Sequence, residues 1–169
     1  MLHPSEHDLR LFAGLAGFAA SILSVPTALA STLVVIIAVD QGDSEIAPAM
    51  AASGLAIGSA VALSVPEPKL VLRDVPTEGP FHAAVIIRAI RNAPVGPDDA
   101  LMLYYGGHKA YDEPRGTYLL ASGDEGRPLF LSQIREELRR KSPHLGVLLM
   151  DCCNELRPVS CSGEMAPEE

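Results

Sequence analysis

Uninterrupted runs of apolar residues divide the chain into the strands of a buried sheet. The runs Thr32–Val39, Ala100–Tyr105 and Leu145–Met150 contain aliphatic or aromatic residues at nearly every position, and Lys69–Arg73 is a shorter run. Strands of a parallel sheet are buried on both faces, so they show continuous apolar runs and not an alternation with polar residues. The pattern therefore predicts a mainly parallel central sheet.

Helical segments lie between these predicted strands. Residues Ala47–Val65 are small or aliphatic, and Pro80–Asn92 and Ser132–Lys141 place apolar residues at helical spacing, with Ser132 capping or opening the last helix. The alternation of strands and helices predicts an α/β fold with helices flanking the sheet. Between them, Lys109–Arg115 is polar and predicts a turn, whereas Gly116–Ser122 predicts a short strand or hairpin arm.

Two of the apolar runs lead directly to residues that could carry chemistry. His108 follows the run Ala100–Tyr105, and Asp151, Cys152 and Cys153 follow the run Leu145–Met150. Parallel strands end at the same edge of a sheet, so these side chains are expected to meet. A nucleophilic cysteine needs a base that generates or holds its thiolate, and an imidazole titrates near neutral pH.

The residues around His108 and Cys153 resemble a known family. The sequence Tyr104–His108 (Tyr-Tyr-Gly-Gly-His) resembles the strand and Ser-Gly-His-Gly turn of caspase-like peptidases, including metacaspases. The sequence Leu148–Asn154 resembles their apolar strand that ends in Asp-x-Cys. Cys153 follows His108 by 45 positions, near the roughly 50 typical of caspases. The resemblance covers about residues 32 to 156 and implies a three-layer caspase-like fold and a cysteine endopeptidase of the peptidase C14 type.

The resemblance also implies a role for each matching residue. His108 would be the general base and Cys153, as the third residue of Asp-x-Cys, the nucleophile in preference to Cys152. The backbone N–H groups of Cys153 and Lys109 would form the oxyanion hole. Asp151 would help to bind a basic P1 side chain, so that the substrate is a peptide or protein cleaved after Arg or Lys.

The chain departs from the family pattern around the proposed site. Lys109 stands where the family has a glycine, and Gly106 stands where it has another small residue. Only 16 residues follow Cys153, fewer than the further strands of such domains need. These departures favour an alternative, a catalytically inactive caspase-like module that acts in binding or regulation. A third alternative is that His108 is a buried strand-end histidine and Cys153 a small core residue.

The first 30 residues have the outline of an export signal. Residues 11–39 contain no charged side chain, and an apolar stretch is followed by Pro26 and the Ala28-Leu-Ala30 triplet, a typical cleavage site. The residues before it are not positively charged, since Glu6 and Asp8 outnumber Arg10. The alternatives are an uncleaved membrane anchor, which would associate the protein with a membrane, and a buried N-terminal helix. The protein would be exported or tethered in the first two cases and cytoplasmic in the third.

Composition and charge limit the number of domains and the partners. The chain has 169 residues, 48% of them hydrophobic, which suits one domain over residues 31–156, and the Pro-, Ser- and Glu-rich residues 157–169 predict a disordered tail. The net charge of −8 argues against a nucleic-acid partner. The basic cluster in residues 135–141 is interleaved with Glu136 and Glu137, as on a solvated helix face.

No cofactor is predicted. The three cysteines lack the Cys-x-x-Cys spacing of structural zinc sites, and no glycine-rich phosphate loop is present. Asp40, Asp43 and Glu45 follow the first predicted strand closely enough to hold a weakly bound Ca²⁺, a requirement that some metacaspases share. The alternative is that these carboxylates belong to a solvated turn.

Overall fold

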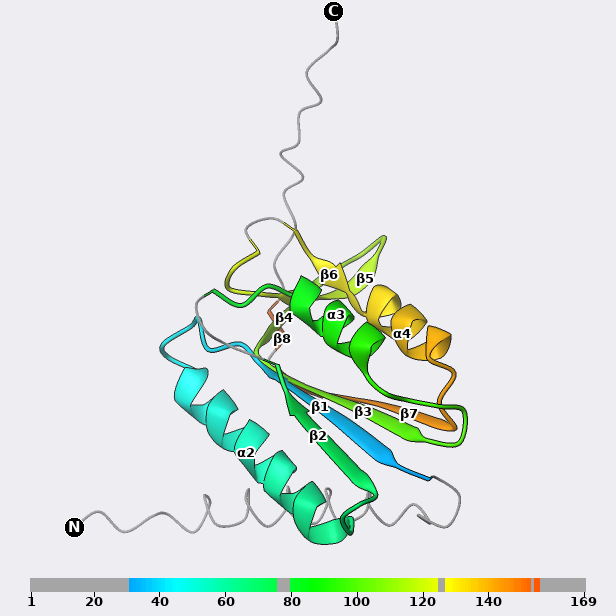
Figure 1. Ribbon diagram of the computed structural model, residues 1–169. Coiled ribbons are helices and arrows are strands. Elements are labelled where there is room, and N and C mark those ends of the chain that lie inside the picture. The colour runs from blue at the N-terminus through cyan, green and yellow to red at the C-terminus, as the bar shows by residue number, and fades with distance from the viewer. Residues whose placement is uncertain (1–30, 76–79, 125–126, 153, 156–169) are drawn as a thin grey trace, which may run out of the picture.

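A four-stranded parallel sheet forms the centre of the molecule (Figure 1). The computed structural model describes residues 31–75, 80–124, 127–152 and 154–155. Within these residues the sheet has the strand order β2-β1-β3-β7. The strands are β1 (Leu33–Val39), β2 (Leu70–Asp74), β3 (Ala100–Gly106) and β7 (Leu145–Asp151), and every neighbouring pair is parallel. The prediction of a parallel sheet built from the four apolar runs is confirmed.

Helices cover both faces of this sheet and give the domain three layers. Helix α2 (Ala47–Ser64) lies on one face, and α3 (Ala84–Asn92) and α4 (Leu131–Arg140) lie on the other (Figure 1). The predicted α/β class is therefore confirmed. The last helix begins at Leu131 without a contribution from Ser132, because the Gln133 side chain accepts the Phe130 N–H at 2.9 Å.

The central strands are apolar at every position because alternate residues enter two separate cores. Ile36 and Leu103 belong to the core beneath α3 and α4, while Ile37 and Met102 belong to the core beneath α2. Successive side chains of a strand point to opposite faces, so a strand buried on both faces needs an apolar residue at each position. Strands β1 and β3 contain no polar side chain except the two tyrosine hydroxyls of β3.

A second, smaller sheet continues from the carboxyl edge of the first. Its strand order is β6-β5-β4-β8, and its strands are β4 (His108–Asp112), β5 (Gly116–Leu120), β6 (Leu129–Phe130) and β8 (Asn154–Glu155). Strands β4 and β5 form an antiparallel hairpin, and β8 runs parallel to β4. The predicted hairpin arm at Gly116–Ser122 is confirmed as β5.

The prediction of a turn over Lys109–Arg115 is wrong for its first half, because Lys109 to Asp112 belong to strand β4. This strand carries two charged residues and has one small core residue, Ala110, which lies opposite Tyr118 of β5. Pairing with β5 fixes the extended conformation of these residues. The sequence did not predict the strand, because its five residues show no alternation of apolar and polar positions. The turn itself is confined to the residues before Gly116, whose φ of 85° suits a glycine.

Candidate active site

The candidate site lies where the two sheets meet, at the carboxyl ends of β3 and β7. Gly106 of β3 lies opposite Asp151 of β7, and the Gly107 N–H donates to the Asp151 carbonyl oxygen at 3.2 Å. Strand β4 begins at His108, so only Gly107 separates the two sheets along the chain. The prediction that these two strands end side by side at one edge of the sheet is confirmed.

Gly107 allows the chain to pass between the sheets because a side chain has no room there. A Cβ atom at this position would lie 2.5 Å from Tyr105 Oη and 3.2 Å from Asp40 Cβ. Both distances are shorter than ordinary van der Waals contact. The second glycine of the Gly-Gly-His sequence is thus required by close packing around His108.

The imidazole of His108 is held by Asp43, which lies in the loop after β1. Its Nε2 atom is 3.0 Å from Asp43 Oδ2, and the His108 and Asp43 side chains are 22% and 42% exposed. The pKa of Asp43 is lowered, first by the hydrogen bond from the Glu45 N–H at 2.8 Å and second by His108. A carboxylate at Nε2 favours the tautomer with its proton on Nε2, so that Nδ1 is the basic nitrogen.

Sequence reasoning did not pair Asp43 with His108. Asp43 was expected to be a calcium ligand or part of a solvated turn, and 65 positions separate it from His108. The two residues meet because β1 and β3 are adjacent and their following loops leave the same edge of the sheet. The only available signal was that an acidic loop follows the neighbouring strand.

Asp151, the residue predicted to bind a basic P1 side chain, is anchored to the core. The Tyr104 hydroxyl donates to Asp151 Oδ2 at 2.9 Å, and the Tyr104 side chain is 1% exposed. Burial, and then the neighbouring Asp151 carboxylate, raises the pKa of Tyr104, so its hydroxyl remains a donor at physiological pH. The hydrogen bond occupies one carboxylate oxygen and fixes the position of the other, Oδ1.

The carboxylate of Asp40 is buried and serves the structure of the site. Asp40 is 3% exposed, and it accepts hydrogen bonds from the Ser122 hydroxyl at 2.6 Å, the Ser122 N–H at 2.7 Å and the Gly42 N–H at 2.9 Å. The two bonds from Ser122 connect the residue after β1 with the segment that follows β5. Asp40 and Asp43, two of the three predicted calcium ligands, thus bind different protein groups. Among the described residues no group of three His, Cys, Asp or Glu side chains is arranged to hold a metal ion.

Cys153, the predicted nucleophile, lies outside the described residues. Its neighbours on both sides are described: Asp151 pairs with Gly106 in the first sheet, and Asn154 pairs with Lys109 in the second. The chain therefore passes between the same two sheets after Asp151 as it does at Gly107. Cys152, the less favoured candidate, is half-buried and packs against the core beneath α3 and α4.

Lys109 occupies the middle of the second sheet. It lies opposite Leu119 of β5 on one side and Asn154 of β8 on the other. Of the described residues other than glycine, only Ser142 has a positive φ, so Lys109 has ordinary strand geometry and its side chain causes no backbone strain. The departure from the family glycine at this position therefore has no conformational cost.

Compared with models of known protein families and with curated proteins, the chain matches none. The sheet topology establishes the α/β class.

Proposed function

We propose that this protein is a caspase-like cysteine endopeptidase in which Cys153 is the nucleophile and His108 the general base. The observation that carries the proposal is the strand register on both sides of the site. Gly106 pairs with Asp151 and Lys109 pairs with Asn154, so the chain passes between the same two sheets twice, once just before His108 and once between Asp151 and Asn154. In the proposed site, the Cys153 thiol on the second passage would lie within reach of the His108 base.

In the proposed mechanism, the Cys153 thiol gives its proton to Nδ1 of His108 and the thiolate attacks the carbonyl carbon of the scissile peptide bond. The tetrahedral intermediate collapses when the imidazolium protonates the departing amine, which leaves an acyl-enzyme thioester. Water, activated by His108, then hydrolyses the thioester and restores the thiol. Asp43 holds the ring at Nε2 through both steps and balances the charge of the imidazolium.

Acidic groups at the site support a preference for Arg or Lys at P1. Tyr104 occupies Oδ2 of Asp151, so Oδ1 is the atom that would accept a hydrogen bond from a guanidinium or ammonium group. Asp43 adds a second carboxylate beside His108, and the protein has a net charge of −8. An acidic P1 side chain would meet repulsion at such a site.

One observation favours the alternative of a non-catalytic module. Lys109 belongs to a strand with neighbours on both sides, and backbone N–H groups of such a strand are directed at those neighbours. The Lys109 N–H, predicted to be one of two oxyanion donors, would then be unable to turn toward a substrate. Cys153 N–H would be the remaining donor, and loss of one donor costs about 10²- to 10³-fold in kcat.

Hydrolysis of fluorogenic peptides separates the two functions. The reduced full chain is expected to cleave an acyl-Arg aminomethylcoumarin and not its acyl-Asp counterpart. Cys153→Ala and His108→Ala should abolish the activity, while Cys152→Ala, the matched control, should retain it. Activity that survives in Cys153→Ala would refute the proposed nucleophile. A folded, reduced protein that cleaves neither peptide would support the binding or regulatory module.

A further inference from the structure

Strand β7 has the sequence of an interior strand but lies at the edge of the first sheet. Apart from Gly146 and the terminal Asp151, each of its residues is large and apolar. Among the described residues, β3 pairs with one side of β7 and no strand pairs with the other. No residue of β7 is fully buried, whereas every residue of β3 is. A continuous apolar run is typical of a strand with neighbours on both sides, so the pattern indicates that β7 pairs with a further strand.

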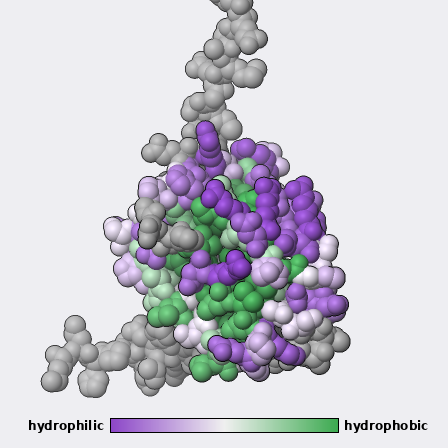
Figure 2. Space-filling view, in the orientation of Figure 1, coloured by the Kyte–Doolittle hydropathy of each residue, from purple (hydrophilic) through white to green (hydrophobic). Residues whose placement is uncertain are grey.

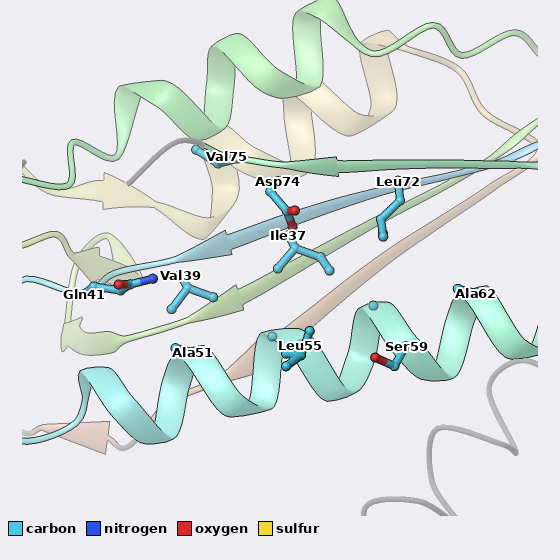
Figure 3. A pocket seen from close by; sticks show the side chains of 12 residues that line it. Ile37, Val39, Gln41, Ala51, Leu55, Ser59, Ala62, Leu72, Asp74 and Val75 are labelled. Carbon is cyan, nitrogen blue, oxygen red and sulfur yellow. The ribbon is translucent and has the colours of Figure 1, made fainter. Parts of the chain in front are cut away.

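The opposite edge of the sheet is protected by charge. Strand β2 ends with Arg73 and Asp74, both exposed, and charges on an edge strand oppose pairing with another strand. Figure 3 shows the side chains of Leu72 and Asp74 turned toward helix α2, over a groove of about 390 Å³ between α2 and strands β1 and β2. Strand β7 has no charge before its last residue, so it is the edge that is suited to accept a further strand.

The outward backbone groups of β7 belong to alternate residues. The Asp151 carbonyl oxygen faces β3, where it accepts the Gly107 N–H at 3.2 Å. Because the peptide groups of successive strand residues point in opposite directions, the N–H and C=O groups of Gly146, Leu148 and Met150 point away from β3. Within the described residues, no strand pairs with these groups. A strand added at this edge would form its hydrogen bonds with these three residues.

A basic groove lies beside this edge. It has a volume of about 450 Å³ and is lined by helix α4, the loop after it and the first half of β7. Arg135 and Arg139 lie four positions apart on α4, and both are exposed. Neither has an ion-pair partner among the described residues, whereas the two glutamates of α4 bind Arg91 and Arg140. Figure 2 shows hydrophilic residues gathered over α4, at the upper right. The described lining of the groove contains no acidic residue, so the groove favours an acidic ligand.

The two faces of an added strand would meet different surroundings. Gly146 and Leu148 line the groove on the α4 side of the sheet, beside the two arginines. Val147 and Leu149 pack against the core beneath α2, on the other side. The side chains of a strand alternate between its two faces. The segment that fits this edge therefore has acidic residues toward α4, alternating with apolar residues toward the α2 side.

We propose that β7 binds an extended segment of another protein in which acidic and apolar residues alternate. The segment adds a fifth strand to the first sheet, its acidic side chains bind Arg135 and Arg139, and its apolar side chains cover Val147 and Leu149. The charge of the groove favours this partner over a second copy of the chain. Antiparallel pairing of β7 with its own copy would bring the arginines of two α4 helices to the same side of the joint sheet, where like charges repel. This inference does not depend on peptidase activity.

Binding of a labelled peptide to the full chain tests the proposal. The probe is a fluorescein-labelled peptide of the length of β7 that alternates valine and glutamate, and a comparison peptide has the same residues in two blocks. Fluorescence anisotropy should detect binding of the alternating peptide only. Arg135→Glu with Arg139→Glu should weaken this binding at least about tenfold, because each arginine loses a charge-assisted hydrogen bond. Arg73→Glu with Arg88→Glu changes the net charge equally at exposed positions of β2 and α3, so this matched control should bind nearly as the natural sequence does.

Amide hydrogen exchange measured by NMR locates the bound peptide. The amides of Gly146, Leu148 and Met150 should exchange at least about tenfold more slowly when the peptide is bound, because they point at the open edge. The amides of Val147 and Leu149 point toward β3 and should change little. Slowing at alternate residues of β7 is the pattern that an added strand produces and that a ligand bound only to the arginines does not.

Several results would overturn the proposal. A folded chain that does not bind the alternating peptide, or that binds the block peptide equally well, has no strand-shaped acidic site. Equal affinity in Arg135→Glu with Arg139→Glu would remove the arginines from the site. Slow exchange of the Leu148 amide in the free monomer would show that another part of the chain already pairs with β7. Slowing that increases with protein concentration, without peptide, would show that a second copy does.

Discussion

Removal of the Ser122 hydroxyl is predicted to destabilise the junction of the two sheets. Ser122 supplies two of the three hydrogen bonds to the buried Asp40 carboxylate, and Ser122→Ala deletes the one at 2.6 Å while the Ser122 N–H remains. It also removes the acceptor of the Phe81 N–H at 3.3 Å. A hydrogen bond to a charged group contributes about 1.5–3 kcal/mol. Because Asp40 is 3% exposed, water cannot replace the lost donor, and we expect a loss within that range.

Urea unfolding followed by far-UV circular dichroism measures this loss. For a domain of this size the slope is about 1–3 kcal/mol per M urea, so the midpoint should fall by about 1 M with an unchanged slope. Ser132→Ala is the matched control, because Ser132 is exposed and Gln133 accepts the Phe130 N–H at the start of that helix. Its midpoint should not move. Equal midpoints for the two variants would refute the assignment of Ser122 as a partner of a buried carboxylate.

Three further predictions concern the site and the helices behind it. Asp43→Asn should lower kcat by at least about tenfold, with little change in KM; the loss stays below the roughly 10⁴-fold of a buried triad carboxylate because Asp43 is 42% exposed. Because the pKa of Asp43 is lowered from 3.8, the contribution of its carboxylate to stability should be present above pH 3.8 and disappear as the pH falls below it. Unfolding of the natural sequence and of Asp43→Asn, measured across this pH range, tests this expectation. Gly107→Ala should cost about 1–3 kcal/mol in chemical denaturation through its clash with Tyr105, whereas Gly146→Ala, whose nearest neighbour is 3.7 Å away, should cost much less. Glu137→Gln should lower the thermal unfolding midpoint at neutral pH and have no such effect in acid. The reason is that Arg91, whose Nε donates to Glu137 Oε2 at 3.0 Å, lowers the pKa of Glu137 from 4.5. An equal fall in the midpoint at both pH values would contradict the ion pair.

The first sheet and its helices could be predicted from the sequence because their signals are local. Strands β1 and β3 are apolar at every position since both of their faces are buried, and helix α2 contains almost only small and aliphatic residues. The local sequence alone is therefore enough to assign these segments as strands or helices. The adjacency of the ends of β3 and β7, where Gly106 lies opposite Asp151, also followed, because parallel strands end at one edge.

The second sheet and the His108–Asp43 contact could not be predicted because they depend on distant partners. Strand β4 contains His108, Lys109 and Asp112, and it is a strand only because β5 and β8 pair with it. Strands β6 and β8 have two residues each, too few for any periodicity. Lys109 stands where the caspase-like pattern has a glycine, and only its place inside β4 shows that its backbone has ordinary strand geometry.

Covalent labelling of the reduced full chain with an acyl-Arg fluoromethyl ketone, mapped by peptide mass spectrometry, tests the proposed His108–Cys153 pair most directly. The account predicts one thioether, on Cys153, which forms more slowly in Asp43→Asn and is absent in His108→Ala. Cys152→Ala should be labelled as fast as the natural sequence. Labelling of Cys152 or Cys161 in place of Cys153, or labelling of Cys153 that is equally fast without His108, would contradict a catalytic pair at this edge of the sheet.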